Sequence, residues 1–71
     1  MEDKEIVKLS KYLKHWAEHN ESHKQDFSKW LEIARLKGLT SIVENLESAI
    51  QMMDKCTQHL LAAHDQLELK P

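Results

Sequence analysis

The chain has 71 residues, enough for a single domain over residues 1–71. Charged residues make up 31% of it and it has one Gly and one Pro, so folds rich in sheet and tight turns are excluded and an all-α domain is expected. The net charge of −2 is unlike the strongly basic surface of most nucleic-acid-binding domains, so we expect no nucleic-acid partner. Because a core of this size rarely contributes more than about 3–5 kcal/mol, oligomerisation or a bound metal ion is expected to add stability.

Cysteine content and hydropathy bear on location. The only cysteine, Cys56, excludes an intramolecular disulfide, which is typical of proteins from a reducing compartment. No apolar run approaches the roughly 18 residues of a membrane-spanning helix, and the first residues lack the profile of a secretory signal. We therefore expect a cytoplasmic protein without a membrane partner.

The first predicted element is a long amphipathic helix over about residues 3–36. Its seam positions recur at alternating spacings of three and four, as on one face of a helix. They are Ile6, Leu9, Leu13, Trp16, Asn20, His23, Phe27, Trp30 and Ala34. Lys37 and Gly38 follow, a cation near the helix C-terminus and a glycine suited to a left-handed cap. The helix is therefore predicted to end here, in a turn over residues 37–40.

A second helix is predicted over about residues 41–68. Ser41 and Glu44 have the spacing of a capping box, and Thr40 is a competing N-cap. The seam of this helix consists of Val43, Leu46, Ile50, Met53, Thr57, Leu60, His64 and Leu67. The spacing again alternates between three and four, so one face is predicted to pack against the first helix.

The short turn makes the two helices antiparallel neighbours, in which residue i faces approximately residue 77 − i. The apolar faces are wider than one partner helix can cover. Further apolar residues flank the seams, namely Tyr12, Ala17, Leu31, Ile33, Ile42, Ala49, Leu61 and Ala63. This width favours a homodimer in which two hairpins form a four-helix bundle, or docking on a partner protein.

The most informative segment holds three histidines, His15, His19 and His23, at i, i+4 and i+8. Neighbouring members of such a ladder have Cβ atoms about 6 Å apart, close enough to bind one metal ion. His15 and His23 are two turns apart, so His19 must take part in any pair. On a helical projection, His23 is predicted to be nearly in the core, His19 at its boundary and His15 mostly solvated. The pattern fits metal ligands or structural histidines.

Polar residues interrupt both predicted seams. Asn20 is at a seam position of the first helix, and Thr57 and His64 are at seam positions of the second. A buried polar group without a partner costs about 1–3 kcal/mol, so such residues need a reason to be there. For Asn20 the reason can be register, because one buried Asn fixes alignment and oligomeric state. His64 either joins the histidine ladder, across the hairpin or a dimer, or is a hydrogen-bonded core residue.

Other groupings are weaker candidates. Asp26 follows His23 by three residues and can accept a hydrogen bond from a ligating imidazole. Cys56 and His59 have a ligand-like spacing, but on a helical projection Cys56 is at the boundary while His59 points outward. One glycine leaves no phosphate-binding loop, and no serine lies in a strained turn, so we expect no enzymatic activity.

Residues 15–23 read H-W-x-E-H-N-x-x-H, and Phe27, Trp30, Ala34 and a Gly-Leu turn follow. This pattern resembles a family of small, uncharacterised prokaryotic helical proteins and domains. The similarity covers most of the chain. It implies a helical hairpin and brings no mechanism with it.

Two functions are therefore open. The first is binding of a divalent transition-metal ion through His19 and His23, with His15 or His64 contributed by the same chain or a dimer mate. Nickel, zinc and copper ions all accept imidazole, so the sequence does not choose among them. The second is a metal-free dimerisation or adaptor module, in which Asn20, His23 and His64 set register and the apolar stripes bind a partner.

Overall fold

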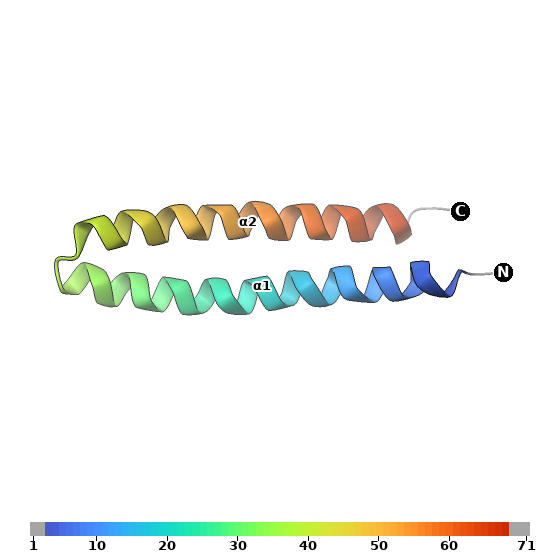
Figure 1. The fold of residues 1–71 in the computed structure, drawn as a ribbon, viewed down its shortest axis with the longest axis horizontal. Helices are drawn as coiled ribbons and strands as arrows, with labels where there is room; N and C mark the ends of the chain where they lie inside the picture. Colours follow the sequence, from blue (N-terminus) through green and yellow to red (C-terminus); the bar gives the residue numbers. More distant parts are fainter. Residues whose placement is uncertain (1–2, 69–71) are drawn as a thin grey trace.

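The computed structural model describes residues 3–68, which form two α-helices and the turn between them. Helix α1 spans Lys4–Leu36 and helix α2 spans Thr40–Glu68. The helices run antiparallel, side by side along their whole length, so the chain is a rod with extents of 57 × 14 × 13 Å (Figure 1). No strand occurs in this part of the chain, and neither helix within it is long and apolar enough to cross a membrane. The predicted all-α antiparallel hairpin is confirmed.

Local sequence signals define both ends of α1. At the start, the Asp3 carboxylate accepts hydrogen bonds from the backbone N–H groups of Glu5 (2.9 Å) and Ile6 (3.4 Å), which makes Asp3 the N-cap. At the end, the Gly38 N–H donates to the Arg35 carbonyl at 3.1 Å, and the next N–H donates to the Ala34 carbonyl at 3.0 Å. These two bonds form a Schellman motif, and the φ of +72° at Gly38 confirms the predicted left-handed cap.

Helix α2 begins two residues earlier than the predicted Ser41 cap requires, and one earlier than the competing Thr40 cap requires. The Leu39 carbonyl accepts the first helical hydrogen bond, from the Val43 N–H at 3.0 Å, so Ser41 is already inside the helix. The reason is the compact turn, in which the Thr40 N–H donates to the Gly38 carbonyl at 3.0 Å and directs the chain straight into helical geometry. The Ser41 N-cap was therefore wrong.

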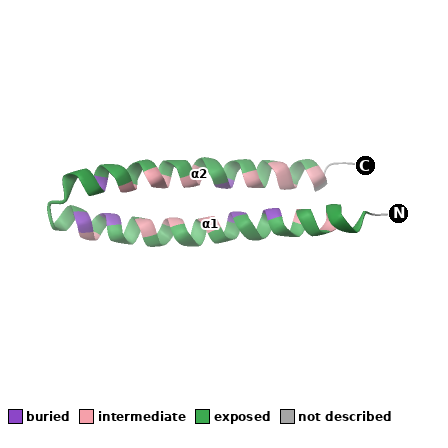
Figure 2. Cartoon of the chain, in the orientation of Figure 1, coloured by how far each residue is buried: buried purple, intermediate pink, exposed green. Residues whose placement is uncertain are grey.

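The seam of α2 packs on α1 as predicted. Val43 and Thr57 are buried. The other seam positions are all half-buried, namely Leu46, Ile50, Met53, Leu60, His64 and Leu67. Figure 2 shows the buried and half-buried residues along the facing sides of the two helices, with the outer sides exposed. The core is thus a single narrow line of contact.

The seam of α1 differs from the prediction. The residues that contact α2 are shifted around the helix and are buried or half-buried, namely Ser10, Leu13, Ala17, Asn20, Lys24, Phe27, Leu31 and Ala34. Five residues predicted for the core are exposed, namely Ile6, Leu9, Trp16, His23 and Trp30. Ala17 explains the shift, because a small side chain lets two helices approach closely whereas the Trp16 indole at the same place would hold them apart.

Candidate functional site

His19 and His23 form the most organised polar group on the surface of the hairpin. Both are exposed on α1, and their Nε2 atoms lie 2.9 Å apart. The rings meet edge to face at 89°, with centroids 4.4 Å apart. Two nitrogens that each lie about 2.1 Å from one ion are about 3.0 Å apart when the bond angle is about 90°. At this distance one Nε2–H donates a hydrogen bond to the other Nε2, with the donor set by the tautomer. Once that proton is displaced, the two nitrogens are spaced as two ligands of one transition-metal ion would be.

His15 lies one turn away from this pair and does not enter it. Its ring stacks on His19 with the centroids 6.0 Å apart and the planes 19° from parallel. His15 is exposed, as predicted, and so are His19 and His23, of which the first was expected at the boundary and the second nearly in the core. The exposure of His23 follows from the shifted seam of α1, which turns this residue away from α2.

His64 is in the α2 seam, with its side chain 20% exposed and Nδ1 3.5 Å from Oδ1 of Asp65. Within residues 3–68 no three His, Cys, Asp or Glu side chains are grouped so that they could hold a metal ion. Of the four predicted ligands, the hairpin therefore brings two together, His19 and His23, and keeps His15 and His64 apart from them.

An ion pair joins the two helices near the polar residues that interrupt the predicted seams. The Lys24 Nζ lies 2.6 Å from Oδ1 of Asp54, at a level between half-buried Asn20 and the turn. The hydrogen bond to Asp54 is the main reason why the pKa of Lys24 is raised above its usual value of 10.5. Sequence reasoning missed this pair, although the 77 − i rule places Lys24 opposite Met53, next to Asp54. The rule itself could have found it.

A second line of side chains runs along the outside of α1, and we call it the outer stripe. Its spacing alternates between three and four, as the inner seam does, but it lies about 100° around the helix from that seam. It consists of Leu9, Tyr12, Trp16, His19, His23, Asp26, Trp30 and Ile33. All are exposed except Ile33, which is half-buried, and the rings of Tyr12 and Trp16 stack 5.7 Å apart. The histidine pair lies at the middle of this stripe.

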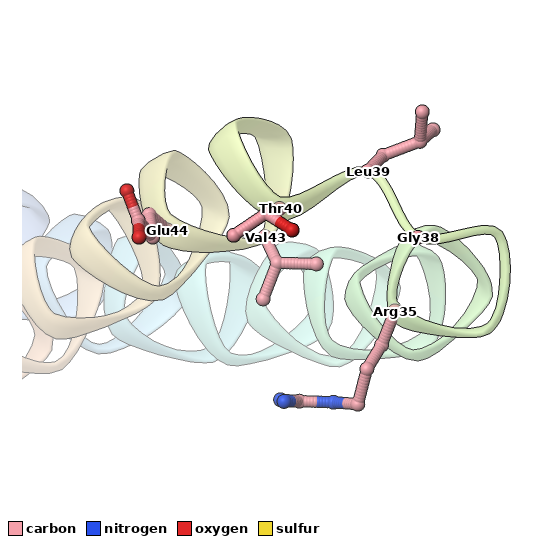
Figure 3. Close-up of a pocket in the computed structure, with 6 residues that line it drawn as sticks. All are labelled: Arg35, Gly38, Leu39, Thr40, Val43 and Glu44. Carbon is pink, nitrogen blue, oxygen red and sulfur yellow. The ribbon is translucent and has the colours of Figure 1, made fainter.

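The turn end of the rod carries a shallow hollow of about 140 Å³. Its lining residues are Arg35, Gly38, Leu39, Thr40, Val43 and Glu44 (Figure 3). Arg35 and Leu39 point away from one another, and the Arg35 guanidinium is 3.4 Å from both Glu32 and Glu47. Arg35 is thus held in ion pairs with Glu32 and Glu47. The residues that line the hollow include no pair of groups suited to acid and base chemistry.

Fold and site define a small all-α hairpin that carries an exposed histidine pair on its first helix. The chain belongs to the family described as "Domain of unknown function (DUF8180)", which matches residues 9–67. These residues include the outer stripe, the turn and nearly all of α2. No curated protein and no solved structure matches the chain significantly.

Proposed function

We propose that the protein binds a divalent transition-metal ion through Nε2 of His19 and of His23. The observation that carries this proposal is the 2.9 Å separation of the two Nε2 atoms. Both side chains are exposed, so an ion reaches them without any opening of the hairpin. A histidine pair at i and i+4 on a helix also needs little reorganisation to bind, because the backbone already sets its geometry.

The remaining ligands come from outside this pair. Zinc is usually four-coordinate, and nickel and copper also accept imidazole, so two positions are left for water or for side chains of another chain. His15 stacks on His19 and can orient its ring, whereas His64 would have to come from a dimer mate. The role is non-catalytic binding, and a cytoplasmic location suits the single cysteine.

Metal-free assembly is the second candidate function. The observation that favours it is the exposure of large apolar side chains, which reaches 52% for Tyr12 and 59% for Trp30. Contiguous apolar surface of this kind marks interaction sites in soluble proteins. In this alternative the hairpin is a homodimerisation or adaptor module, and the histidines act only through packing.

A titration tests the metal proposal. Ni²⁺ or Zn²⁺ is added to chelator-stripped protein at pH 7.5, and thermal unfolding is followed by circular dichroism. We expect either ion to raise the midpoint, and the double variant His19→Ala and His23→Ala to lose that gain. The matched control is His59→Ala, an exposed histidine on α2 that should keep it.

Acidity gives an independent readout. Metal binding needs neutral imidazoles, so the gain in midpoint should shrink below about pH 6. If neither ion moves the midpoint of the unaltered protein at pH 7.5, or if the double variant responds to metal as the unaltered protein does, the metal proposal is wrong.

A further inference from the structure

The outer stripe of α1 has the same spacing, and similar or complementary residues, when followed from either end. Its eight positions run from 9 to 33 and are centred on residue 21, so position i has a counterpart at 42 − i. The pairs are Leu9 with Ile33, Tyr12 with Trp30, Trp16 with Asp26, and His19 with His23. A surface that matches its own reverse is what an isologous contact about a two-fold axis requires.

Each of these pairs is chemically compatible. Leu9 and Ile33 are both aliphatic, and two aromatic rings pair at Tyr12 and Trp30. At Trp16 and Asp26 an indole N–H can donate to a carboxylate, which would otherwise be an unpaired charge among apolar groups. The alternation of three and four residues is also the spacing that packs two helices along a line.

The orientation follows from the same positions. If two copies of α1 packed in parallel, each residue would face its own counterpart, and the two Asp26 carboxylates would repel one another in the contact. The antiparallel arrangement separates the Asp26 residues. In this arrangement residues 6–36 of one copy lie along residues 36–6 of the other, so nearly all of Lys4–Leu36 takes part in the contact.

The length of the surface suits a dimer. From residue 9 to residue 33 the helix rises by about 36 Å, so the stripe runs along most of α1. Although Trp16 stacks on Tyr12 and the Lys29 Nζ lies over the ring of Trp30, both indoles stay largely open to solvent, Trp16 at 45% exposed and Trp30 at 59%.

We propose that two copies of this chain pair α1 with α1 in antiparallel along the outer stripe, and that His19 and His23 of both copies form one four-imidazole site for a single divalent transition-metal ion at the two-fold axis. The metal part of this inference rests on the function proposed above. The chemistry is that of a four-nitrogen site for a zinc, nickel or copper ion, with two ligands from each copy. Each histidine pair supplies two of the four ligands, and the pair of the other copy supplies the remaining two.

Stoichiometry and assembly are measured on the chelator-stripped chain by native mass spectrometry and analytical ultracentrifugation, with Zn²⁺ and Ni²⁺ as probes. We expect one ion per two chains and a dissociation constant of the dimer at least tenfold lower with the ion than without it. Trp30→Glu should abolish the dimer, whereas Met52→Glu, at an exposed methionine of α2, should leave it intact. Circular dichroism checks that both variants remain helical.

A disulfide experiment tests the orientation. Two chains are made in the Cys56→Ser background, one with Leu9→Cys and the other with Ile33→Cys. Antiparallel pairing predicts that oxidation cross-links the mixture of the two chains and neither chain alone. Cross-linking of each chain with itself would instead show parallel pairing and overturn the proposed dimer.

The outcomes separate the two proposals. One ion per chain, bound by a monomer, would overturn the shared site and leave the proposed metal function standing. Failure of both ions to bind would overturn the metal function and the shared site together, while the disulfide between the two different chains would still decide the pairing of α1. A monomer with and without metal, and no cross-link in the mixture, would overturn the antiparallel dimer.

Discussion

Helix α1 presents two lines of side chains with the same spacing and very different surroundings. The inner seam uses small and aliphatic residues such as Ala17 and Leu31, and it is covered by α2. The outer stripe uses aromatic and histidine side chains such as Trp16 and His19, and solvent covers it. The difference teaches that small side chains such as Ala17 allow close approach within the hairpin, whereas both indoles stay outside it. The larger groups, which have more binding capacity per residue, are left available for contacts beyond it.

The largest expected effect contrasts two adjacent residues, one from each line. Leu31 is 6% exposed in the cluster with Ala34 and Val43, so Leu31→Ala should cost about 2–5 kcal/mol of unfolding free energy. Trp30→Ala should cost much less under conditions where the protein is monomeric, because its side chain is 59% exposed. Urea unfolding at low protein concentration and without metal measures both. Equal losses would show that the two lines are equally buried.

Metal should stabilise the protein through the outer stripe alone. At a free ion concentration of about 100 times the dissociation constant, one site on the folded state adds about 2.7 kcal/mol. Urea unfolding with and without Zn²⁺ measures this gain, which His23→Ala should remove. In contrast, Leu31→Ala should lower stability with and without the ion by similar amounts. A loss of the metal gain in Leu31→Ala protein that remains folded would contradict the independence of the two lines.

The turn between α1 and α2 depends on one glycine. Gly38 has φ of +72°, where a Cβ would meet no neighbouring atom within 4 Å, so the penalty for Gly38→Ala is purely conformational. We expect a loss of about 1 kcal/mol in urea unfolding. Lys37→Ala, at the preceding turn residue with ordinary backbone angles, is the control and should change stability less.

The smallest expected effect concerns the ion pair between Lys24 and Asp54 inside the seam. The pKa of Lys24 is raised in the folded protein, chiefly by its hydrogen bond to Asp54. The charged lysine therefore stabilises the fold fully below its unfolded pKa, and this contribution is lost as the pH rises through the folded value, above 10.5. Lys24→Met should be less stable than the unaltered protein at pH 8, and the difference should narrow near pH 12. A difference in stability that stays the same between pH 8 and pH 12 would show that the effect comes from packing and not from charge. Thermal midpoints measure it.

How far the sequence predicts the structure differs between the helices. In α2 one apolar line dominates, so its seam from Val43 to Leu67 was predicted correctly. In α1 the inner seam and the outer stripe lie close together around the helix. The predicted seam took residues from both, so it included Trp16 and left out Ala17. Resolving them requires knowing how closely the partner helix approaches, which is a property of the packed pair.

The same limit applies to the candidate site. The spacing of His19 and His23 predicts that their rings meet, and the structure places their Nε2 atoms 2.9 Å apart. The position of His23 outside the core could not be predicted, because it follows from the rotation of α1 against α2. Lys24 is a different case, because the 77 − i rule already places this half-buried residue next to Asp54, and the ion pair could have been predicted.

The placement of the two tryptophans has a spectroscopic consequence. Trp16 and Trp30 are the only indoles in the chain, and both are on the outer stripe, whereas neither is buried between the helices. Their emission is therefore a poor reporter of whether the hairpin is closed. It should instead respond to whatever covers the stripe, and Cu²⁺ bound at His19, three residues from Trp16, should quench it. The chain thus carries an intrinsic optical signal for association and metal loading that is separate from its folding.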